Sequence, residues 1–110
     1  MEVRAVAKSI GVSPLKVRRL LDLVRGQRAE QALGLLRYMP SPSAKLVAKV
    51  VRSAIANAEN NYQIAPADLR IVRIFADEGP TMKRFRASAK GRARPILRRS
   101  SHITVVVAEE

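Results

Sequence analysis

The stretch LRIVRIFADEGPTMKRFRASAKGRARPILRRSSHITVVVA, residues 69–108, decides the fold. Its two ends, 69–76 and 102–108, are rich in β-branched and apolar residues, which is typical of strands. Two such segments can pair in an antiparallel sheet, and a short apolar segment at 3–7 is expected to add a strand that ends near Gly11. The stretch therefore predicts a small antiparallel sheet from which the intervening residues project.

Those intervening residues carry a strong positive charge and few large apolar side chains. Residues 79–108 contain no acidic residue, and eight cations lie among them: Lys83, Arg84, Arg86, Lys90, Arg92, Arg94, Arg98 and Arg99. Such a segment cannot build a core of its own, so it is either a solvated loop or a ribbon ordered by a partner. The two-residue spacing of the cations favours the ribbon, because side chains at that period line one face of a strand.

The ribbon is expected to turn at Lys90-Gly91. If residues 80–99 form two strands of about ten residues, the ribbon extends by roughly 30 Å, at about 3.3 Å per residue. An isolated two-stranded hairpin is marginally stable in water. We therefore expect it to be mobile in the free protein and ordered when a partner is bound.

Three helices are predicted upstream of this stretch. Ser13-Pro14 is a helix start, followed by an apolar stripe and by Gly26 at the expected end. A second helix fits 29–38, and Ser41-Pro42 begins a third that is expected to end near Asn60-Asn61. The fold class is thus α+β. It is a three-stranded antiparallel sheet packed on three helices, in one domain with a body (1–79 and 100–110) and a hairpin arm (80–99).

The overall charge indicates a polyanionic partner. The 110 residues include 21 Lys and Arg against 9 Asp and Glu, a net charge of +12. This excess is typical of nucleic-acid-binding proteins, while an anionic membrane surface is the other polyanion to consider.

There is no cysteine, so disulfides, zinc knuckles and thiol catalysis are excluded. Without a signal-peptide pattern or a run of about 20 apolar residues, a soluble intracellular protein is expected.

No pattern typical of catalysis is found. His102 is the only histidine, which excludes a two-histidine metal site. Asp77 and Glu78 are adjacent, and neighbouring strand residues point to opposite faces, so they form a poor acid–base pair. No glycine-rich phosphate loop occurs. The sequence predicts no enzyme activity and no cofactor.

Three blocks of residues resemble a known family over nearly the whole chain. They are 13–18 (SPLKVR), 56–61 (ANAENN) and a last block that leads from 77–80 (DEGP) through 83–84 (KR) to 90–93 (KGRA) and closes with 99–105 (RSSHITV). In order and spacing they are similar to the universal large-subunit ribosomal proteins numbered twenty-two in the bacterial scheme. The resemblance implies an α+β body at the subunit surface near the exit-tunnel mouth, and a long hairpin that threads between ribosomal RNA segments to line the tunnel. It also implies a role in assembly, with neighbouring ribosomal proteins and the nascent polypeptide at the hairpin tip as further partners.

The resemblance and the charge pattern together predict RNA-binding residues in the arm and in the body. In the arm they are Lys83, Arg84, Arg86, Lys90, Gly91, Arg92, Arg94, Arg98 and Arg99. In the body they are Ser13, Lys16, Arg18, Arg19, Lys49, Arg52, Asn57, Asn60, Asn61 and His102. Helix capping is an equal alternative for the three asparagines, and a structural role is the alternative for His102.

The chain departs from the family pattern at two places. Ala87-Ser88 stands where similar proteins commonly have a Pro-Arg pair, which removes a rigid residue and a cation near the tip. Ser43 stands where lysine is common, which weakens one phosphate contact.

Two other classes stay open on composition. A DNA-binding architectural protein with a β-arm would bind arbitrary duplex DNA, usually as a dimer. A peripheral membrane protein would need a basic amphipathic helix with large apolar residues at the interface, whereas these helices use their apolar faces for the core. The leading hypothesis, a ribosomal protein, predicts neither a membrane nor a homo-oligomer.

Overall fold

The computed structural model describes residues 2–79, 82–87 and 93–109. The elements follow in the order β1 (Glu2–Ile10), α1 (Pro14–Val24), α2 (Ala29–Tyr38), α3 (Pro42–Tyr62), a 3-10 turn (Pro66–Asp68), β2 (Leu69–Glu78), β3 (Met82–Ala87), β4 (Ala93–Arg98) and β5 (Ser101–Glu109). The predicted α+β class and all three helices are confirmed.

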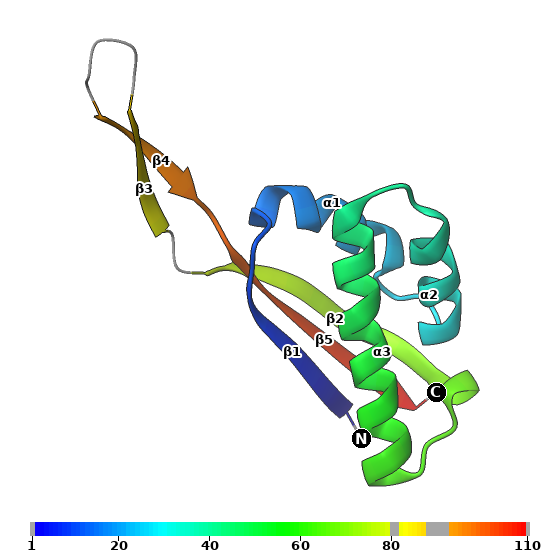
Figure 1. The fold of residues 1–110 in the computed structure, drawn as a ribbon. Coiled ribbons are helices and arrows are strands. Elements are labelled where there is room, and N and C mark those ends of the chain that lie inside the picture. Colours follow the sequence, from blue (N-terminus) through cyan, green and yellow to red (C-terminus); the bar gives the residue numbers. More distant parts are fainter. Residues whose placement is uncertain (1, 80–81, 88–92, 110) are drawn as a thin grey trace.

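The sheet has three antiparallel strands in the order β1-β5-β2, so the C-terminal strand lies in the centre. Val106 of β5 is paired with Arg4 on one side and with Arg73 on the other. The three helices lie together on one face of this sheet (Figure 1). The predicted addition of the N-terminal strand is confirmed, and the strand ends at Ile10, one residue before Gly11.

The core is built from small aliphatic residues, as the scarcity of aromatic residues requires. α3 crosses the sheet with eight buried residues, four of which are alanines. Alanine at these positions lets α2 and α3 approach closely, while Leu21, Leu36 and Ile74 fill the space between helices and sheet. The pattern-based bounds of α2 agree with the structure. α3 runs one residue past Asn60-Asn61, to Tyr62, and Gln63 ends it with a left-handed backbone (φ 54°).

Polar groups from the helical side contact backbone groups on both edge strands of the sheet. Along β2, the Ile71 carbonyl accepts from the Gly26 amide (3.1 Å), and the Ile71 amide donates to the Gln27 carbonyl (2.9 Å). Further along the strand, the Arg25 guanidinium donates to the Ile74 carbonyl at 2.9 Å. On β1, the Asn57 side chain donates to the Arg4 carbonyl at 3.3 Å. These contacts satisfy backbone groups that an edge strand would otherwise present to other chains.

The arm begins where the β2–β5 pair ends. Glu78 pairs with Ser101, and the Gly79 amide donates to the Ser100 carbonyl at 2.9 Å. Beyond that point β3 and β4 form a separate two-stranded antiparallel ribbon outside the three-stranded sheet (Figure 1). The register pairs position 84 with 96 and 86 with 94, so 84, 86 and 94 share a face of the ribbon. The predicted ribbon is confirmed, whereas the turn at Lys90-Gly91 lies outside the described residues.

Candidate nucleic-acid interface

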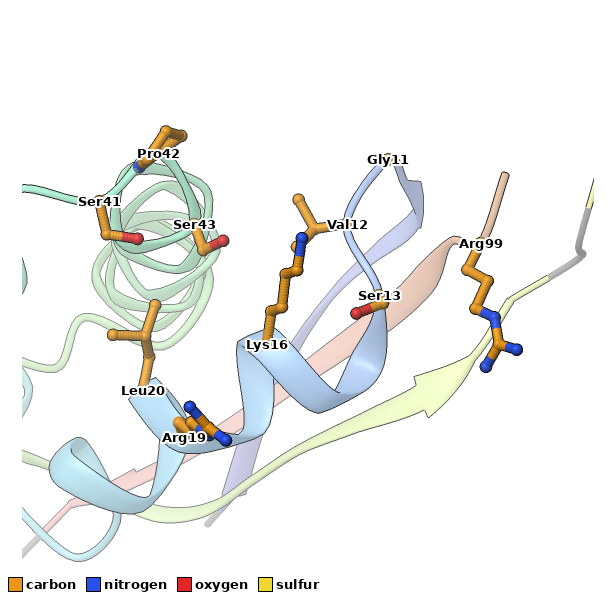
Figure 2. A pocket seen from close by; sticks show the side chains of 10 residues that line it. All are labelled: Gly11, Val12, Ser13, Lys16, Arg19, Leu20, Ser41, Pro42, Ser43 and Arg99. Atoms are coloured by element: carbon orange, nitrogen blue, oxygen red, sulfur yellow. The ribbon is translucent and has the colours of Figure 1, made fainter. Parts of the chain in front are cut away.

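A cleft of about 780 Å³ lies where α1 and α3 begin (Figure 2). Its lining residues are Gly11, Val12, Ser13, Lys16, Arg19, Leu20, Ser41, Pro42, Ser43 and Arg99. α1 and α3 each start at a Ser-Pro pair, and both helices begin on the same side of the body. Their two starts therefore line one cleft. Arg99 comes from the base of the arm, far away in sequence.

The chemistry of the cleft suits an anion. Three cations, Lys16, Arg19 and Arg99, line it without any acidic residue. Each of the three is exposed, and none makes a hydrogen bond or ion pair with another described residue. A phosphate entering the cleft would therefore not have to displace an existing carboxylate.

Backbone and hydroxyl groups add to this charge. Ser13 and Ser41 occupy the N-cap positions, but neither hydroxyl caps its helix. Pro14 and Pro42 begin the two helices and have no N–H, so the unpaired amides of each first turn, which carry partial positive charge, belong to the residues after the proline. The cleft thus combines three cations with free hydroxyls, a set that can contact phosphate oxygens.

Two of the predicted RNA-binding residues are used within the body. The Arg18 guanidinium donates twice to the Ala76 carbonyl, from Nε at 3.2 Å and from Nη2 at 3.0 Å. Asn57 is half-buried and holds β1 to α3. Neither of the two equal alternatives for Asn57, capping or RNA contact, anticipated this contact. RNA contacts of Arg18 and Asn57 stay predictions. Both side chains also hold elements of the body together, a role that the sequence did not indicate.

The other predicted body residues lie apart from the cleft. Lys49 and Arg52 are exposed on α3, and Asn60 and Asn61 are exposed at its C-terminal end. His102 is half-buried on β5, opposite Asp77 of β2 and close to Gly79. The structure does not bring these residues into one site with the cleft.

The predicted arm residues divide into three groups. Lys83, Arg84, Arg86, Arg94 and Arg98 lie on β3 and β4. Lys90, Gly91 and Arg92 lie outside the described residues. Arg99 follows β4 and lines the cleft, so the arm and the body interface meet there.

Sequence reasoning did not name Ser41 as a binding residue, and it named Ser43 only as a weakened phosphate contact, although both line the cleft. The repeated Ser-Pro start was visible in the sequence, but two helix starts at a distance of 28 residues do not by themselves indicate a shared cleft. In the described part of the chain, no group of three or more His, Cys, Asp or Glu residues is arranged to hold a metal ion. No described helix is both long enough and apolar enough to cross a membrane.

An α+β body with a cation-lined cleft and a basic two-stranded ribbon is typical of a protein that binds nucleic acid. Comparisons with known proteins narrow this class. Residues 5–108 match the family described as ribosomal protein L22p/L17e. The chain is 60% identical over 109 residues to a large ribosomal subunit protein uL22 of Dehalococcoides mccartyi. This alignment covers 99% of this chain and all of the relative. It is 51% identical over 110 residues to uL22 of Halothermothrix orenii, covering all of this chain and 97% of the relative.

The chain belongs to the ribosomal protein L22p/L17e family. It is a structural, non-enzymatic constituent of the large ribosomal subunit, located in the cytoplasmic ribosome among ribosomal RNA and other ribosomal proteins. The family resemblance on which the sequence analysis relied is confirmed.

Proposed function

We propose that the chain binds large-subunit ribosomal RNA through two connected surfaces, the cleft at the starts of α1 and α3 and the β3–β4 ribbon. The observation that carries this proposal is a set of three cations around the cleft that have no partner among the described residues. One of them, Arg99, continues directly into the acid-free arm. Contacts of both surfaces with different RNA segments would hold those segments together, and in this way the protein would support assembly of the subunit.

Binding by phosphate neutralisation makes a quantitative test possible. The double variant Lys16→Gln with Arg19→Gln should weaken binding to large-subunit ribosomal RNA. It should also reduce the slope of log affinity against log salt concentration by about 1.4 to 1.8, the value for two lost phosphate contacts. The matched control is Arg4→Gln with Lys8→Gln, which removes the same charge from exposed residues outside the cleft. Equal slopes for the two variants would contradict a role for the cleft.

We also propose that the arm lines the polypeptide exit tunnel, with its tip beside the nascent chain. Support comes from the resemblance and from the ribbon, which projects from the body as a tunnel-lining element must (Figure 1). A photoreactive amino acid at position 90, in assembled translating ribosomes, should form crosslinks to the nascent polypeptide. The same group at position 8, in the body, should form none. Crosslinks from both positions or from neither would contradict this placement.

A further inference from the structure

A second depression lies between α2 and α3 and shares no lining residue with the cleft. Its volume is about 330 Å³. Its lining residues are Leu33, Leu36, Arg37, Met39, Lys45, Ala48, Lys49 and Arg52. We call it the α2–α3 groove. Only Lys49 and Arg52 were singled out by the sequence analysis as binding residues.

The groove has an apolar floor and a basic rim. Leu36 and Ala48 are buried, and Leu33 and Met39 are half-buried. The four cations of the rim are exposed, and none has an ion-pair or hydrogen-bond partner in the described part of the chain. Three of them follow one face of α3 at i, i+4 and i+7, a row of about 10 Å.

The floor and the rim together indicate the occupant. Four unpaired cations without an anion complement a polyanion, and a floor of aliphatic side chains complements a flat apolar surface. An unpaired nucleotide offers both, because its phosphates are charged and its base exposes a face. A paired duplex offers only the phosphates, since its bases stay stacked on one another.

We propose that the α2–α3 groove binds one unpaired nucleotide of RNA. The base lies on Leu33 and Met39, and the flanking phosphates contact Arg37 and the cations of α3. The volume is near the lower end of the range for small-molecule pockets, which suits a single nucleotide rather than a longer segment. This inference rests on the proposed function, since RNA is the partner that it specifies further.

The absence of tryptophan from the chain allows a direct test with the full-length protein. Leu33→Trp places one indole on the floor, and Leu35→Trp places one on the exposed side of the same helix. Titration with a single-stranded oligoribonucleotide should quench the emission of the Leu33→Trp protein strongly and leave the Leu35→Trp protein nearly unchanged. A fully paired RNA duplex should not quench either protein. Equal quenching by the duplex, or quenching only by an acidic amphipathic peptide, would overturn the proposal.

A second pair of variants covers the case in which the indole itself alters the site. Leu33→Glu puts a carboxylate on the floor and should weaken single-strand binding about fivefold, the lower end of the effect of losing one base stacked on an aromatic side chain, because this floor is aliphatic. Leu35→Glu should leave it within twofold. Circular dichroism of both proteins checks that α2 is intact.

Fluorescence anisotropy with a labelled large-subunit RNA fragment separates this proposal from the wider one. If the unmodified protein binds the fragment but neither Leu33 variant differs from its Leu35 control, the groove proposal fails and the proposed function stands. If the unmodified protein does not bind the fragment at low salt, the proposed function fails as well.

Discussion

Two glycines show how the same substitution has opposite effects in different surroundings. A Cβ at Gly79 would lie 2.6 Å from the Ser100 hydroxyl and 3.3 Å from the Ser100 carbonyl carbon, whereas a Cβ at Gly34 would meet nothing within 4 Å. Gly79→Ala should therefore lower the free energy of unfolding by about 1–2 kcal/mol, as overpacking does. Gly34→Ala, within α2, should raise it by about 0.5–1 kcal/mol. Urea denaturation measures both changes in the free energy of unfolding. If Gly79→Ala leaves this free energy unchanged, Ser100 moves away from the added methyl group at little cost, and the prediction is wrong.

Arg18 and Arg19 are neighbours on α1 but have different roles. Arg18 donates to the Ala76 carbonyl, while Arg19 lines the cleft without a partner in the described residues. Because the Ala76 carbonyl already holds its guanidinium, Arg18→Gln should cost about 1 kcal/mol of stability and change the salt dependence of RNA binding less than Arg19→Gln does. Arg19→Gln should leave stability unchanged and reduce the salt slope by one contact. These roles are contradicted if Arg19→Gln lowers the stability while Arg18→Gln reduces the salt slope. Sequence alone could not separate these arginines, because the carbonyl that Arg18 meets is 58 positions away.

At the scale of elements, local patterns predicted what depends on local physics. Helix stripes, Ser-Pro starts and β-branched runs located α1, α2, α3, β2 and β5, because burial on one face imposes its period on the sequence. Features that depend on two distant segments were missed. The cleft needs α1 and α3 to begin together, and the link from Asn57 to the Arg4 carbonyl needs α3 to lie along β1. The predicted end of α3 near Asn60-Asn61 lies one residue before the observed end at Tyr62.

The β3–β4 ribbon should behave differently from the sheet that it extends. Its two strands pair only with each other within their sheet, whereas β5 has a partner strand on both sides. Isolated hairpins are marginally stable, so amides of 82–87 and 93–98 should exchange fast in the free protein and more slowly with RNA bound, while those of β5 stay protected in both. Hydrogen exchange followed by mass spectrometry resolves these segments. Strong protection of the ribbon without RNA would contradict a partner-ordered arm.

At the scale of the whole molecule, positive charge and hydrophobic core are separated. Aliphatic side chains fill the space between helices and sheet, while residues 79–99, which precede the buried strand β5, hold eight cations and no acid. The described part of the chain includes the ion pairs of Arg25 with Asp22 and of Arg73 with Glu2, and all four of these side chains are about half exposed or more. Such pairs contribute little to stability, so most of the net charge of +12 acts as self-repulsion until a polyanion neutralises it.

This self-repulsion predicts opposite effects of salt on the free protein and on its complex. Raising sodium chloride from 50 to 500 mM should increase the melting temperature of the free protein, because screening weakens repulsion among unpaired cations. Over the same range the affinity for ribosomal RNA should fall steeply, because the release of counterions into a more concentrated salt solution gains less entropy. Calorimetric melting of the free protein and anisotropy with labelled RNA measure the two slopes. Replacing Arg4 and Lys8 with Gln is a control, since it should raise the low-salt melting temperature while changing RNA affinity less than the loss of Lys16 and Arg19. A melting temperature that falls with salt would mean that the exposed ion pairs outweigh the repulsion, and the excess charge would then need no polyanion to relieve it.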